Sequence, residues 1–407
     1  HNPAGFQKIA HGLSGSFDKK YSKGVIKSIE ETTGLFLKNS ENINQIDTAL
    51  QLASGNAFLG LLQEDVVDYA KNICISQYFA SAESVEKSYL KIASLIKSIF
   101  AAYKQHVYLL VNTNLTDDDY GSDSKITFED ILQSNDPISV NIGSFESGTY
   151  ISAKTILKSH NYSNNTNITI TTEDAFIGIQ NVVNGTTAAA FLVAPHPSTT
   201  LTKISNTAPV KLVKVYMPVD DKIYREDGTI LPDSFPFQSE AINNSITVRT
   251  VVAGGPSFST KSLKVFLDHI YANKDEYMGL STLWKQTNQK LTTDLIADNP
   301  QKANYYAISY FLDQEVLIPE NVKNEIASDT VTSNNHKMAS ELIFLLSYNL
   351  DIDLREKNTT GAWENAYWMM QGEAVLSLVP DSLFSHLSSF KDTYNSIMLS
   401  SMEKILP

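Results

Sequence analysis

The first 254 residues alternate between strand-type and helix-type apolar patterns, and this alternation restricts the fold more than any other feature. Continuous apolar runs predict strands at 57–63, 105–113 and 138–142. Apolar residues at helical spacing predict helices at 46–52 and 150–159. Alternating strands and helices favour an α/β fold in which a mostly parallel sheet is flanked by helices.

One short arrangement occurs twice, at 46–63 and at 174–194: a helix, a glycine at the turn and an apolar strand. The repetition predicts two similar α/β lobes. In open α/β sheets, ligands bind beyond the carboxyl ends of the strands. We therefore expect a binding crevice where the strand ends of the two lobes meet.

A polar, acidic and turn-rich segment at 113–125 marks the first domain boundary, and we expect hinge motion around 112–125 and 210–220. The segment 218–240, rich in Pro, Asp and Phe, is predicted to be a long loop. Beyond about residue 260 the apolar spacing is helical. The predicted division is lobe 1 at 1–115 and 215–318, lobe 2 at 116–214, and a helical C-terminal extension at 319–407. An aromatic and methionine-rich stripe in the extension is either core or a face that docks a protein partner: Trp363, Tyr367, Trp368, Met369 and Met370.

The composition excludes several classes of partner and site. A count of 32 Lys and Arg against 45 Asp and Glu gives a net charge of −13, which argues against nucleic acid as a partner. The one cysteine, Cys74, permits no internal disulfide and no cysteine-rich metal centre, and we predict neither a metal nor a cofactor. No apolar run is long enough to span a bilayer, and an opening without methionine suggests a processed, exported form.

Signatures of catalysis are scarce. The chain has no G-x-S-x-G elbow and no H-E-x-x-H helix, and the glycines at 251–259 lack P-loop spacing. His196 stands between two prolines at a predicted strand end, which favours a rigid wall residue over a base. We predict no catalytic residues and no enzymatic activity; an unexpected pairing of His11 or His196 with a carboxylate is the alternative.

The polar residues with a chemical role follow the predicted strands. Ser147, Gly148 and Thr149 stand between a predicted strand and a predicted helix. This position suits a small anion because helix N-termini present free N–H groups. The alternative is a simple helix cap. Similar donor-bearing loops occur at 11–17, at Gln63 and at 195–199. Donor-bearing strand ends without a nucleophile are more typical of a receptor than of an enzyme.

The order of these segments resembles the TAXI-type solute receptors of tripartite (TRAP) transporters over about residues 9–318. The segments that carry the resemblance are "IAHGLSGSF", "TALQLASGNAFLGLLQEDV", "ISVNIGSFESGTYISAKTIL" and "VVNGTTAAAFLVAPHP". The third resembles the family's "GxxGSGT" loop and is the most specific. No counterpart is known for 320–407.

The resemblance implies a type II periplasmic-binding-protein fold and a periplasmic or otherwise extracytoplasmic receptor, with membrane anchoring before processing left open. Such a receptor captures a small carboxylate-bearing solute, an organic acid or amino acid, for the membrane subunits of a transporter. The ligand-binding residues that it implies, together with the wall residues after the "AAAFLVA" strand, are Ser14, Gly15, Ser16, Gln63, Ser147, Gly148, Thr149, Pro195 and His196.

The sequence also departs from the family pattern. Ser16-Phe17-Asp18-Lys19 replaces the usual Gly-Thr-Tyr-Tyr, and Pro195 replaces a glycine. The scaffold is retained while much of the ligand shell differs, so we expect a changed ligand or a loss of binding. The alternative function is a surface or signalling protein that reuses the receptor fold and docks a partner through 319–407.

Overall fold

The computed structural model describes the chain in several stretches. These stretches are 6–12, 16–53, 57–70, 96–116, 126–254, 263–299, 302–304, 307, 310 and 311. The predicted C-terminal extension at 319–407 and Cys74 lie outside the described residues.

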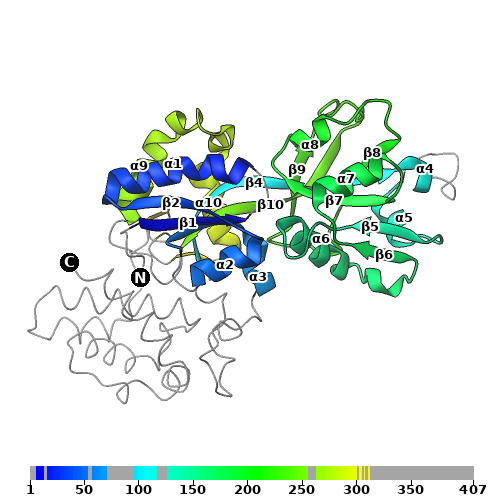
Figure 1. Cartoon of the computed structure of the whole chain (residues 1–407), viewed down its shortest axis with the longest axis horizontal. Helices are drawn as coiled ribbons and strands as arrows, with labels where there is room; N and C mark the ends of the chain where they lie inside the picture. Colours follow the sequence, from blue (N-terminus) through cyan, green and yellow to red (C-terminus); the bar gives the residue numbers. More distant parts are fainter. Residues whose placement is uncertain are drawn as a thin grey trace, which may run out of the picture.

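Ten described strands form one sheet in the order β2-β1-β3-β10-β4-β7-β5-β6, with β8 on β4 and β9 on β10. Figure 1 shows that the sheet runs through two lobes joined at a narrow waist. The strands are β1 (Phe6–Gly12), β2 (Phe36–Asn42), β3 (Leu59–Gln63), β4 (Lys97–Asn112), β5 (Ile138–Asn141), β6 (Ile168–Thr171), β7 (Ala189–Ala194), β8 (Val210–Val213), β9 (Arg225–Ile230) and β10 (Ile242–Gly254).

Helices cover both faces of the sheet in the first lobe, with α1 and α9 above it and α2 and α3 below it in Figure 1. In the second lobe, α6 and α7 pack on β7. The helices are α1 (Ser16–Thr33), α2 (Gln45–Ala53), α3 (Glu64–Tyr69), α4 (Thr113–Thr116), α5 (Phe128–Leu132), α6 (Gly148–Ser159), α7 (Ala175–Val183), α8 (Thr199–Thr202), α9 (Leu263–Tyr277) and α10 (Gln289–Asp298), with 3₁₀ turns at η5 (Tyr162–Asn164) and η6 (Thr282–Gln286).

The two lobes share one topology. In the first, β1 lies between β2 and β3, and all three run parallel. In the second, β5 lies between β6 and β7 in the same way. The chain follows the same path in both, from the central strand through a helix to one side and through a second helix to the other. The predicted two-lobed α/β architecture, with parallel strands flanked by helices, is confirmed.

The repeated helix–glycine–strand arrangement has a local cause in the second lobe. Gly185, between α7 and β7, has a φ of 79°, a left-handed conformation that side chains disfavour. The turn brings the apolar residues of β7 directly back onto the sheet, where five of the six are buried.

The long strand β4 belongs to both lobes. It pairs with β10 from Lys97 to His106 and with β7 from His106 to Val111. The chain therefore passes between the lobes inside a strand, near His106, and not only through the loops expected around 112–125 and 210–220. The lobe boundaries stay a prediction.

Candidate functional site

A cavity of about 1080 Å³ lies between the lobes. Each of the six parallel strands contributes its carboxyl end or the segment after it to the wall, three strands from each lobe, as expected for open α/β sheets. The wall residues include Gly12 at the end of β1 and Phe17 after it, Asn44 after β2, Gln63 at the end of β3, Ser147 after β5, Asp174 after β6 and Pro195 after β7. We call this cavity the cleft.

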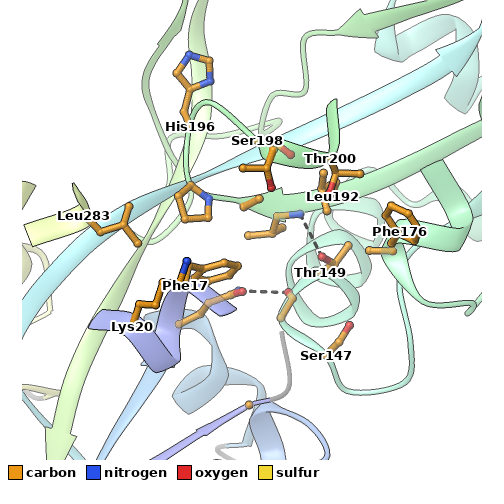
Figure 2. Close-up of a pocket in the computed structure, with 18 of the residues that line it drawn as sticks. Phe17, Lys20, Ser147, Thr149, Phe176, Leu192, His196, Ser198, Thr200 and Leu283 are labelled. Atoms are coloured by element: carbon orange, nitrogen blue, oxygen red, sulfur yellow. Dashed lines mark hydrogen bonds between the residues drawn. The ribbon is translucent and has the colours of Figure 1, made fainter. Parts of the chain in front are cut away.

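The structure brings most of the predicted site residues together. Those that line the cleft are Gln63, Ser147, Gly148, Thr149, Pro195 and His196. Ser14 and Gly15 lie outside the described residues, and Ser16 is described only as the first residue of α1, without its side chain. Figure 2 shows Ser147 and Thr149 on one side of the cleft and residues of α1 on the other.

The hydroxyl groups at the start of α6 accept hydrogen bonds from backbone N–H groups of the chain itself. The Ser147 Oγ accepts the Tyr150 N–H at 3.2 Å, so Ser147 is the helix cap. The Thr149 Oγ1 accepts the Val193 N–H at 3.1 Å and ties the helix to β7. Both O–H groups remain available as donors. In the described part of the chain, the N–H groups of Gly148 and Thr149 have no hydrogen-bond acceptor.

Gln63 reaches across from the first lobe and contacts the second lobe directly. Its Nε2 lies 3.2 Å from the Gly148 carbonyl oxygen and 3.0 Å from the Ser152 Oγ. A Cβ at position 148 would stand only 1.9 Å from the Gln63 Oε1, so this approach requires glycine. The side chain is 3% exposed. Gln63 therefore borders the cleft but uses its amide to join the lobes.

Asp65 completes this junction. Its Oδ2 accepts hydrogen bonds from the Ser152 hydroxyl at 2.6 Å and from the Tyr224 hydroxyl at 2.8 Å, and its Oδ1 accepts from the Gln63 Nε2 at 3.1 Å. Burial raises the pKa of the Asp65 carboxyl, although these donors oppose the shift. We refer to Gln63, Asp65, Gly148, Ser152 and Tyr224 as the lobe contact.

The ring of His196 packs against other side chains of the protein. Its Nδ1 lies 2.6 Å from the Tyr108 hydroxyl, and it stacks on His106 with ring centroids 4.8 Å apart. Burial lowers the pKa of both histidines, that of His106 to about 4. Figure 2 shows the His196 ring directed away from the other labelled residues. This geometry fits the predicted role of His196 as a rigid wall residue. The role of His196 in ligand binding stays a prediction.

Sequence reasoning missed Phe17 and Lys20, which both line the cleft from α1. The segment 11–17 was predicted to be a loop, whereas α1 begins within it, at Ser16. Among the described cleft-lining residues, Lys20 is the sole Lys or Arg, and none of the described ion pairs includes it. The sole carboxylate in that lining is Asp174, whose side chain caps α7 by accepting the Phe176 N–H at 2.9 Å.

The described residues contain no group of three or more His, Cys, Asp or Glu side chains arranged to hold a metal ion. None of their helices combines the length and the apolar character that a membrane crossing requires.

A comparison with protein-family models finds no match, and a comparison with curated proteins finds none either. Among solved structures, the chain is similar to the periplasmic binding protein BugD, with 11% identity over 77% of this chain and 99% of that one and a TM-score of 0.44. It is also similar to the GluR0 ligand-binding core in complex with L-glutamate (11% identity, 70% and 99% coverage, TM-score 0.39). A third similar structure is the Bordetella pertussis BvgS periplasmic VFT2 domain (10% identity, 70% and 93% coverage, TM-score 0.37). Values of this size define neither a family nor a ligand for the chain.

Proposed function

We propose that the chain is a receptor that binds a small anionic solute in the cleft between its lobes. The observation that carries the proposal is the placement of Lys20. This cation lines the cleft from the first lobe, while the first turn of α6 lines it from the second. A carboxylate between them would meet a positive side chain and the free N–H groups of Gly148 and Thr149.

The hydroxyl chemistry of the second lobe supports an anion over a cation. Ser147 and Thr149 each accept a backbone N–H, which leaves their O–H groups to donate. A bound anion would therefore meet donors from side chains and backbone together. The lining combines apolar side chains with many neutral polar groups from both lobes, so a bound solute would meet both kinds of surface.

Thermal-shift and calorimetric titrations with a panel of organic acids and amino acids test this proposal. Lys20→Gln is expected to weaken binding of every carboxylate about tenfold or more, because it removes the cation. Lys23→Gln is the matched control, since Lys23 is an exposed cation of the same helix that does not line the cleft. Binding that is equal in the two variants, or absent for all anions, contradicts the proposal.

The finer proposal is an extracytoplasmic receptor that hands its solute to the membrane subunits of a TRAP-type transporter. Its support is the resemblance of the strand-end loops, of which the one within 138–157 is the most specific. Solute uptake into vesicles that contain candidate membrane subunits, with and without this chain, is the test. Uptake that does not depend on the chain, in the presence of a solute that it binds, contradicts the transport role.

A further inference from the structure

Large apolar side chains gather in the cleft although they remain open to solvent. Ile43 is 80% exposed, Phe176 is 48% exposed and Leu280 is 40% exposed, and all three line the cleft. They come from three separate segments: the one after β2, the first turn of α7, and the segment between α9 and η6. Exposed apolar side chains that converge on one cavity from both lobes indicate a site for an apolar guest.

The more buried part of the cleft continues this apolar surface. Phe17, Leu192 and Leu283 line it from α1, β7 and η6. In Figure 2, Leu283 and Phe176 stand at opposite ends of the labelled residues, with Phe17 and Leu192 between them. Apolar side chains therefore occur along the cleft, alternating with polar residues such as Ser198 and Thr200.

The charges of the cleft are too few for a doubly charged guest. Among its described lining residues, Lys20 is the sole Lys or Arg and Asp174 the sole Asp or Glu. A first carboxylate has Lys20 and the α6 N–H groups as partners. A second carboxylate would lose water without gaining a cation, which is unfavourable, and the Asp174 charge would repel it.

We propose, as an extension of the proposed function, that the solute is a monocarboxylate with an aromatic or branched apolar body. The carboxylate lies between Lys20 and the start of α6. The apolar body lies along Phe17, Leu192 and Phe176. Dicarboxylates are disfavoured by the lack of a second cation in the described lining.

The test compares four acids by calorimetry on the full chain: 3-phenylpropionate, 4-methylpentanoate, succinate and glutarate. The two apolar monocarboxylates are expected to bind about tenfold or more tightly than the two dicarboxylates. Phe176→Ser is expected to weaken 3-phenylpropionate binding about tenfold, because it removes apolar contact area. Ile177→Ser is the matched control: Ile177 is 47% exposed on the same helix, outside the cleft lining, and its loss should leave affinity unchanged.

The outcomes separate this inference from the function on which it rests. If glutarate binds more tightly than 3-phenylpropionate and Lys20→Gln abolishes that binding, the anion receptor stands and the apolar monocarboxylate is wrong. Equal effects of Phe176→Ser and Ile177→Ser would also overturn the inference. If no acid of either class binds, both proposals fall.

Discussion

The lobe contact and the cleft are neighbours built from the same strand ends, yet their chemistry is opposite. In the lobe contact, the Gln63 and Asp65 side chains are 3% and 2% exposed, and each makes hydrogen bonds across the lobes. In the cleft, Lys20 has no partner among the described ion pairs, and Phe176 is 48% exposed. The lobe contact pairs its polar groups within the chain, whereas the cleft leaves a cation and an aromatic ring exposed.

This difference follows from the first two turns of α6. Gly148 and Ser152 face the first lobe and bond Gln63, because the absence of a Cβ at 148 permits the approach. Ser147 and Thr149, on the same helix start, border the cleft. A single helix thus contacts the first lobe and also presents donors to the space between the lobes. Substitutions of side chains that bond within the chain should change stability, whereas those of Lys20 and Phe176 should change binding.

Gly148→Ala should produce the largest loss of stability, because the new Cβ would meet the Gln63 Oε1 at 1.9 Å. Gln63 must then move and give up hydrogen bonds to Gly148 and Ser152, at a cost of about 2–3 kcal/mol. Urea unfolding measures the loss, and small-angle scattering measures the separation of the lobes. The double variant with Gln63→Ala should be no less stable than Gln63→Ala alone, since the clash is gone. Additive losses would show that the two residues are not coupled.

The strands of the parallel sheet were predictable because each buried strand stands in the sequence as a short, continuous apolar run. The run at 57–63 contains β3, which is buried at every position, and the run at 138–142 contains β5. It missed β9 (Arg225–Ile230) because an edge strand that pairs only with β10 needs few apolar residues. The segment 218–240 was predicted to be a loop, and this was wrong at β9.

The site was predictable only in part, for a different reason. The position of Ser147, Gly148 and Thr149 at the crevice follows from the rule that parallel strands share an edge at their carboxyl ends. The hydrogen bond from Gln63 to the opposite lobe depends on the orientation of the two lobes. No local sequence pattern encodes that orientation. Lys20 was missed because its helix begins within a glycine-containing segment that predicts a loop.

The pH dependence of stability should report on the region beside the lobe contact, because two buried carboxyl groups, Glu64 and Asp65, stand together at the start of α3. Burial raises the pKa of Glu64, beside Asp65, from 4.5 to about 7, although Glu64 pairs with the Arg249 guanidinium at 3.1 Å. The folded chain therefore holds this proton more tightly than the unfolded chain. Between pH 4.5 and 7 the free energy of unfolding should fall as pH rises, by at most about 1.4 kcal/mol per pH unit.

Urea titrations from pH 4.5 to 8 measure this slope, and Glu64→Gln should flatten it. Lys20→Gln should leave the slope unchanged, because Lys20 belongs to the cleft. A slope that survives Glu64→Gln would assign the pH dependence to another group.

Ser147→Ala should have the smallest effect on stability, yet it distinguishes the two roles of the α6 start. The variant loses the acceptor for the Tyr150 N–H and should cost about 1 kcal/mol, as other helix caps do. Asn288→Ala is the matched control, because Asn288 caps α10 in the same way, by accepting the Leu291 N–H at 2.8 Å, and does not line the cleft. Both variants should lose similar stability in urea. If Ser147 also donates to a bound carboxylate, only Ser147→Ala should weaken binding, by about fivefold. Equal affinities in the two variants would show that Ser147 only caps the helix. Lys20 and the backbone N–H groups would then be the groups that bind the anion.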